Sequence, residues 1–219
     1  DPTAVLYVRK DDLDPATGKL KAGVPVEPLV LRAAAGDCIT VTLENRLPEA
    51  MPDLPTYAIM QGVVKRDRNG PQGSTTFNNN LMRPSSHAGF HAQLLSYDIT
   101  RSDGVNVGIN PVQTVPPRAA GQSAWPTRSY QFYAGHLERE GKPVSQVVRN
   151  VDNINATPIE FGGLNLLPAD PIKQAQKGLS GAMSILPVGS TWTEDPGMRA
   201  AATVQAPGQT TFRDFSLIW

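Results

Sequence analysis

The sequence has no excess of charge of either sign and no long hydrophobic run. Its 219 residues carry 20 basic and 20 acidic side chains, for a formal net charge of zero. A nucleic-acid-binding or anionic-membrane surface needs a basic excess, so the balance argues against both partners. No apolar run approaches the roughly 18 residues of a membrane-spanning helix, and we find no signal peptide. We interpret Asp1-Pro2 as compatible with the start of a mature, processed chain.

Cysteine and histidine, the common ligands of transition metals, are also scarce. One cysteine, Cys38, and three histidines are present, so no internal disulfide forms. A blue copper site needs two histidines, a thiolate and a weak axial ligand such as methionine. Cys38 lies early in the chain, and the nearest histidine is His87. This separation argues against a blue site. We interpret Cys38 as a buried thiol that packs as a small hydrophobe, with a copper thiolate as the alternative.

Glycine and proline are plentiful and punctuate short apolar runs. The 19 glycines and 20 prolines are spread singly along the chain, as expected for turns between short strands. A chain of this length can bury about 70% of its unfolded surface in a core. The pattern favours an all-β antiparallel sandwich with one short helix over 169–177. The expected strands cover residues 4–8, 28–32, 38–43, 90–99, 127–134, 182–186, 200–204 and 211–219.

Two turns have distinct signatures. Gly36-Asp37 precedes the alternating residues Ile39, Val41 and Leu43, which is a hairpin-like signal between strands 28–32 and 38–43. Ser102-Asp-Gly104 follows the expected strand 90–99 and is interpreted as a turn whose glycine can take a positive φ.

The domain organisation includes two long polar stretches that lack periodicity, at about 48–84 and 136–157. Loops of this length are usually functional or form interfaces, so we interpret both as insertions. We expect residues 1–205 to form one domain. The stretch 206–219 is interpreted as a linker and the truncated first strand of a following domain, because its strand pattern runs to Trp219 without a closing turn.

The histidines suggest at most a partial metal site. His87 and His91 are four residues apart, and His136 joins them only if the fold brings it near. Two or three imidazoles suffice for copper or zinc where the geometry is right. The alternative is that His91 is a hydrogen-bonded strand histidine and His87 a solvated loop residue. We find no nucleophile elbow, complete calcium loop or phosphate-binding glycine-rich loop.

Several segments resemble multicopper oxidases. The segment Gly36-Asp-Cys-Ile-Thr-Val-Thr-Leu-Glu-Asn-Arg-Leu47 looks like their G-D-x-I-x-V-x-L-x-N-x-L pattern, and Phe90-His-Ala-Gln-Leu-Leu-Ser-Tyr-Asp98 resembles their His-x-His strand. The large bacterial manganese-oxidase branch is similar at Tyr130–Gly135, Glu160–Asp170, Ile172–Gly178 and Phe212–Phe215.

The resemblance implies a cupredoxin-like Greek-key β-sandwich with two long insertions and one short helix. It also implies a copper-dependent, periplasmic or secreted oxidoreductase that passes electrons from metal ions such as Mn(II), or from organic donors, to dioxygen. Other cupredoxin domains or companion chains of the same oxidase would be its partners, and a homo-oligomer is an open alternative.

This sequence departs from the family pattern at its metal ligands. His91 matches the first histidine of a His-x-His pair, but Gln93 stands in the second place, and an amide oxygen is a poor ligand for copper. The second expected pair is absent, because Gly162-Gly-Leu-Asn165 contains no histidine. We therefore expect a scaffold domain or partial copper site that is inactive as this chain alone. The alternative is a free-standing cupredoxin-like binding or assembly module without catalysis.

Overall fold

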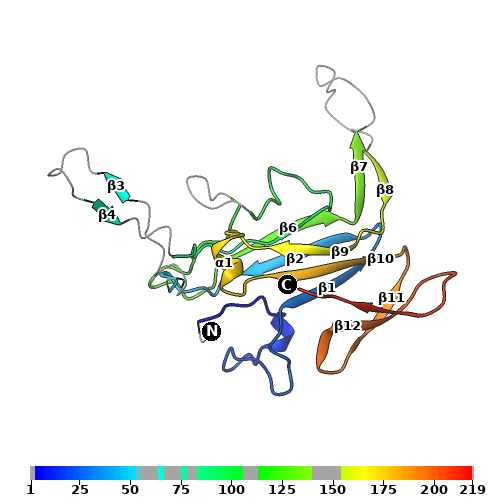
Figure 1. The fold of residues 1–219 in the computed structure, drawn as a ribbon, viewed down its shortest axis with the longest axis horizontal. Helices are drawn as coiled ribbons and strands as arrows, with labels where there is room; N and C mark the ends of the chain where they lie inside the picture. The colour runs from blue at the N-terminus through cyan, green and yellow to red at the C-terminus, as the bar shows by residue number, and fades with distance from the viewer. Residues whose placement is uncertain are drawn as a thin grey trace.

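The fold is built almost entirely from β-strands (Figure 1). The computed structural model describes residues 3–52, 54, 64–66, 75–77, 83–105, 113–139 and 154–218. Its strands are β1 (Leu29–Ala34), β2 (Cys38–Glu44), β3 (Val64–Arg66), β4 (Thr75–Phe77), β5 (His91–Ala92), β6 (Thr127–Tyr133), β7 (Gly135–Arg139), β8 (Ile154–Pro158), β9 (Gly162–Leu167), β10 (Gly181–Leu186), β11 (Thr191–Asp195), β12 (Met198–Gln205) and β13 (Phe212–Phe215).

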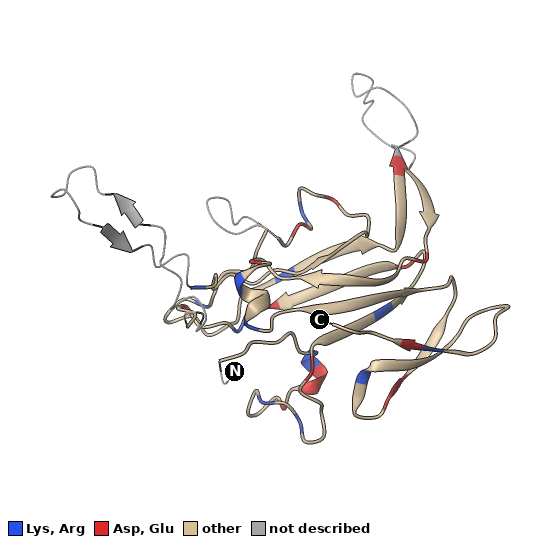
Figure 2. Cartoon of the chain, viewed as in Figure 1, with Lys and Arg blue, Asp and Glu red and all other residues tan. Residues whose placement is uncertain are grey.

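Helical structure in the described residues is limited to a 3-10 turn, η1 (Lys10–Asp12), and one short α-helix, α1 (Lys173–Gln176). None of the described helices is long and apolar enough to cross a membrane. Figure 2 shows basic and acidic residues interspersed over the described elements, in line with the balanced composition. The many strands and the scarcity of helix in the described residues confirm the all-β fold class expected from the sequence.

Two layers of strands enclose the core. One layer is a sheet in the order β1-β10-β9-β5, in which β1 and β10 run parallel and the other pairs antiparallel. The facing layer is the antiparallel pair β2-β6. A third sheet, β11-β12-β13, lies beside β1, and the antiparallel pair β7-β8 extends away from the sandwich (Figure 1). The arrangement is a β-sandwich with appended strands.

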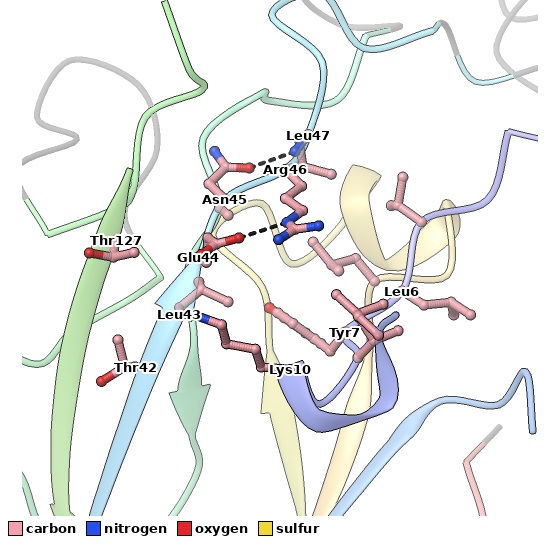
Figure 3. Close-up of a pocket in the computed structure, with 15 residues that line it drawn as sticks. Leu6, Tyr7, Lys10, Thr42, Leu43, Glu44, Asn45, Arg46, Leu47 and Thr127 are labelled. Carbon is pink, nitrogen blue, oxygen red and sulfur yellow. Dashed lines mark hydrogen bonds and ion pairs between the residues drawn. The ribbon is translucent and has the colours of Figure 1, made fainter. Parts of the chain in front are cut away.

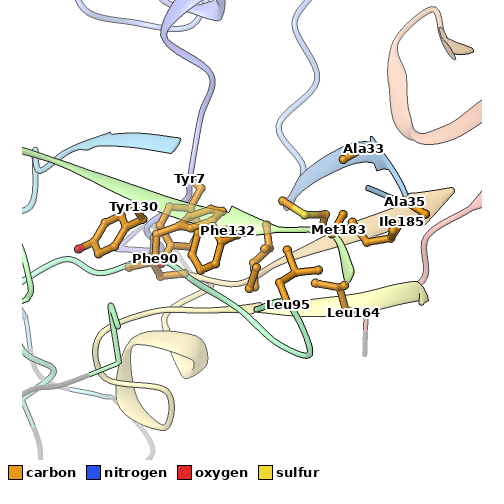
Figure 4. Packing of buried hydrophobic residues seen from close by; sticks show 14 residues of the cluster. Tyr7, Ala33, Ala35, Phe90, Leu95, Tyr130, Phe132, Leu164, Met183 and Ile185 are labelled. Carbon is orange, nitrogen blue, oxygen red and sulfur yellow. The ribbon is translucent and has the colours of Figure 1, made fainter. Parts of the chain in front are cut away.

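The core lies between these layers (Figure 4). Tyr130 and Phe132 of β6 are buried, as expected from their alternation, and Phe90 packs between them and Tyr7. The rings of Tyr7 and Phe90 meet edge to face with centroids 5.9 Å apart. Such pairs add about 0.5–1.5 kcal/mol beyond the burial of their area. The opposite layer contributes aliphatic side chains, namely Ala33, Leu164, Leu166, Met183 and Ile185.

The turn at Gly36-Asp37 joins the two layers and does not close a hairpin. β1 pairs with β10 and β2 with β6, so the hairpin expected between strands 28–32 and 38–43 is wrong. Gly36 has φ +91°, which favours glycine, and its amide donates to the carbonyl of Ala134. Asp37 accepts a hydrogen bond from the amide of Ala34 through Oδ2 at 2.8 Å. The turn thus passes the chain from one layer to the other.

The expected strand 90–99 is largely absent, because here too the chain passes from one layer to the other. Only His91 and Ala92 form a strand, β5, paired with β9. Leu94 then adopts φ +67°, which turns the chain, and Ser96 bridges to Tyr133 of β6 in the other layer. A period-2 pattern indicates that every second side chain is buried, but it does not show that the segment changes from one sheet to another.

Other expected elements are reproduced with shifted ends. Strands occur near 28–32, 38–43, 127–134, 182–186, 200–204 and 211–219, whereas 4–8 forms no strand and β11 was not expected. The helix expected over 169–177 is reduced to α1, and Gly178 follows it with φ +94°. The amide of Val5 donates to the carbonyl of Lys177, so the N-terminal segment crosses the end of this helix.

The expected insertions lie mostly outside the described residues. Within 48–84 the structure describes the antiparallel pair β3-β4, and the pair β7-β8 frames the stretch 136–157. The division at residue 205 stays a prediction. Within the described part, β13 pairs with β12, and its Asp214 contacts Arg32 and Ser184 of the four-stranded sheet.

Candidate functional site

His91 lies at the edge of the four-stranded sheet, on the two-residue strand β5. Its side chain is 15% exposed, and its ring stands edge-on to Tyr97 with centroids 5.2 Å apart. Burial lowers the pKa of His91 because it disfavours the imidazolium, and the nearby Asp103 carboxylate partly offsets this effect. A neutral imidazole with a free nitrogen lone pair is the form that binds metal ions.

The Nδ1 atom of His91 is buried and has no hydrogen-bond partner among the described residues. Oδ1 of Asp103 lies 3.6 Å from this nitrogen, beyond hydrogen-bonding distance. Buried polar atoms of native proteins are nearly always paired, so this nitrogen needs an explanation. A neighbouring chain, a water molecule or an ion would each satisfy it.

Gln93 occupies the second position of the expected ligand pair. Its amide donates to the carbonyl of Asn165 at 3.1 Å, which continues the pairing of β5 with β9 by one residue. Residues two apart on a strand project from the same face. The positive φ of Leu94 follows at once and costs about 1–2 kcal/mol for a residue other than glycine. Gln93 lies just beyond β5 and continues its backbone pairing, so an amide stands at the position two residues after His91.

The Ser102–Gly104 turn holds Asp103 beside His91. The amide of Asp103 donates to Oε1 of Gln113 at 2.8 Å, and Oδ1 of Asp103 accepts from the amide of Val105 at 3.1 Å. Gly104 does not use the positive φ that is open to a glycine in a turn. Glycine is needed there for close approach, because a Cβ atom would lie 2.4 Å from the carbonyl oxygen of Phe90. The turn is thereby packed directly against the chain that leads into His91.

His87 and His136 have separate surroundings. Nδ1 of His87 is 3.0 Å from Oγ1 of Thr114, next to the Ala88–Val115 bridge. The buried amide of Gln174 also donates to the carbonyl of His87 and fixes this segment against α1. His136 lies on β7, is exposed, and has Nε2 3.2 Å from Oε1 of Glu138.

The described residues do not form a complete metal centre. Among them, no group of three or more His, Cys, Asp or Glu side chains is arranged to hold an ion. Cys38 is exposed, so its expected burial is wrong. The reason is the alternation of β2, whose inward positions Ile39, Val41 and Leu43 pack on the core and leave Cys38 facing outward. The described residues can therefore supply a copper site with only one imidazole ligand, that of His91.

A cavity of about 520 Å³ lies on another side of the sandwich, between the N-terminal segment and the end of β2 (Figure 3). Its walls are mainly aliphatic and are formed by Val5, Leu6, Leu13, Leu43, Leu47 and Leu179. Sequence reasoning missed this site, because the wall combines a segment expected to be a strand with residues far along the chain. No local motif signals such a cavity.

The polar groups around the cavity fall into two kinds. Asn45 is buried and fully engaged: Nδ2 donates to the carbonyls of Ser86 and Val115, and Oδ1 accepts from the amide of Leu47. Charged side chains are Lys10, Glu44 and Arg46, and Figure 3 shows the ion pair between the last two, with Arg46 Nε 2.6 Å from Glu44 Oε1.

A scan against protein-family models matches none of them, and a search of curated protein sequences gives no significant match. The resemblance to multicopper oxidases therefore depends on the segments quoted from the sequence.

Proposed function

We propose that this chain is a ligand-poor, cupredoxin-like domain that serves as a scaffold within a larger multicopper-oxidase-like protein. In this role it supplies at most one copper ligand, His91, to a site completed by other domains or companion chains. The parent activity is oxidation of a metal ion such as Mn(II), in the periplasm or outside the cell. This chain alone is not expected to turn over substrate.

The observation that carries the proposal is the state of His91. Its imidazole is mostly buried, and this burial lowers its pKa. Its Nδ1 atom has no hydrogen-bond partner in the described residues, and it stands on a strand two positions before Gln93. A histidine kept for packing alone usually donates or accepts at each buried nitrogen. An imidazole that awaits an outside partner accounts for the unpaired atom.

The proposal is supported further by the fold, because the two facing layers are the framework on which cupredoxin sites are built. The described residues lack the other ligands that a copper centre of this kind requires. A scaffold role accounts for a two-layer β-sandwich whose described residues lack most of the copper ligands.

A gain-of-ligand variant tests the proposal. Replacing Gln93 by His restores the His-x-His spacing at the end of β5, so Gln93→His should bind Cu(II) at least about tenfold more tightly than the wild type. The double variant His91→Gln/Gln93→His should lose this gain. His136→Gln is the matched control, because its exposed ring lies on β7, and it should leave the affinity unchanged.

The measurement is isothermal titration calorimetry with Cu(II) in a weakly competing buffer, with circular dichroism to verify folding. If Gln93→His gains no affinity, then His91 does not present its imidazole toward a shared metal position. In that case the partial-ligand role is refuted, and only the structural role of the domain remains.

A further inference from the structure

We propose that the cavity between the N-terminal segment and β2 binds an amphipathic carboxylate, with its alkyl chain inside and its anionic head at Lys10. This inference goes beyond the scaffold role and does not depend on copper. The cavity volume, about 520 Å³, lies within the range of roughly 300–1,000 Å³ that is typical of small-molecule sites.

The walls point to an alkyl chain. Leu6, Leu43 and Leu47 line the cavity and remain partly exposed to solvent, although they are large aliphatic side chains. A ligand that covered them would remove apolar surface from water, which is favourable in proportion to the area buried.

Among the described residues, the buried polar side chains that line the cavity, Tyr7 and Asn45, already have hydrogen-bond partners. The buried amide of Asn45 already has partners on both Nδ2 and Oδ1. The hydroxyl of Tyr7 donates to the carbonyl of Gly89, and burial raises its pKa, so it stays protonated and engaged. The polar interactions of a ligand must therefore be made at the mouth of the cavity.

Charge at the mouth favours an anion. Lys10 is exposed, and its side chain forms no hydrogen bond or ion pair with the described residues. Arg46 is already paired with Glu44, and these two charges largely cancel. Among the described residues that line the cavity, Lys10 is thus the charged side chain without an ion-pair partner, and a carboxylate is complementary to it (Figure 3). Neutral lipids and alkylammonium ions lack this complementarity.

The test uses decanoate as the probe and decylammonium as its charge-reversed counterpart, with the whole chain, at low ionic strength. Calorimetry should give saturable 1:1 binding of decanoate with a dissociation constant on the order of 100 µM. Decylammonium should bind about fivefold more weakly, the difference expected from one exposed charge pair. Lys10→Glu should reverse the order of the two probes, whereas the control Lys19→Glu, at another exposed lysine, should not.

A second variant tests the location. Val8 lines the cavity and is 41% exposed, so Val8→Trp should fill the mouth without disturbing the core and should weaken decanoate binding at least about tenfold. Val26→Trp is the matched control, because Val26 is exposed and does not line the cavity. Circular dichroism verifies that each variant folds.

Three outcomes would overturn the inference. The first is the absence of saturable decanoate binding, or binding that Val8→Trp leaves intact. The second is equal affinity for both probes together with no effect of Lys10→Glu, which would refute the anion preference. The third is a concentration-dependent dimer that Val8→Trp abolishes, because the cavity would then receive a second copy of the chain. None of these results depends on metal content, so they leave the scaffold proposal to its own test.

Discussion

Replacing Asp214 by Asn should destabilise the whole sandwich, because Asp214 neutralises a fully buried arginine on another sheet. The side chain of Arg32 is 0% exposed, and its Nε lies 2.8 Å from Oδ2 of Asp214. The guanidinium also donates to the carbonyls of Arg199 and Ala200. This one side chain of β1 therefore connects to both β12 and β13.

The expected loss of unfolding free energy depends on the partners that Arg32 keeps after the substitution. Removing one partner of a buried ion pair typically costs about 3–5 kcal/mol, because a charge is left buried without compensation. Here Glu194 stays 3.7 Å from Nη1 of Arg32, and an asparagine oxygen still accepts a hydrogen bond. We therefore expect the free energy of unfolding to fall by about 2–3 kcal/mol.

Urea unfolding followed by tryptophan fluorescence measures this change, and Trp192 on β11 reports from the same sheet. Asp195→Asn is the control: Asp195 pairs with the exposed Arg213, and its loss should leave the unfolding free energy nearly unchanged. If Asp214→Asn shifts the unfolding free energy by less than about 0.5 kcal/mol, then Asp214 does not compensate Arg32, and β13 is not integral to this domain.

Three further results are expected. Gly104→Ala should lower the unfolding free energy by more than about 2 kcal/mol in urea titrations, because its Cβ would overlap the Phe90 carbonyl and force the backbone apart; an unchanged midpoint would refute the close approach. The hydrogen bond from Arg199 lowers the pKa of Asp12 below its unfolded value of about 3.9. The contribution of ionised Asp12 to the free energy of unfolding should therefore be complete above that pH and be lost as the pH falls through the folded pKa. Asp12→Asn should accordingly flatten the acid limb of a stability–pH curve, and an unaltered limb would contradict this. Cys38 is exposed, so a thiol reagent should modify native protein about as fast as urea-unfolded protein; strong protection would contradict its outward position.

The sequence predicts the strands that keep one inward face over their whole length. β6 and β10 are examples, because alternating or continuous apolar residues indicate burial of one or both faces. It does not predict where a strand changes layers. The turn at Gly36 and the reversal at Leu94 both send the chain to a different partner, and partner choice depends on contacts far along the sequence.

The candidate site, too, could be predicted from the sequence only in part. A strand around His91 and its two-residue spacing to Gln93 follow from local pattern and resemblance. The position of Asp103 beside His91, and the separate surroundings of His87 and His136, come from packing between distant segments. The cavity at Lys10 likewise exists only where the N-terminal segment crosses the end of β2.

The most direct test of the central claim is the copper content of the purified chain together with its visible absorption spectrum. A scaffold domain with one contributed imidazole predicts weak, substoichiometric copper without intense blue absorption, and His91→Gln should remove what is bound. One tightly held copper per chain with an intense blue band would contradict the account, because this chain would then complete a thiolate-ligated centre by itself.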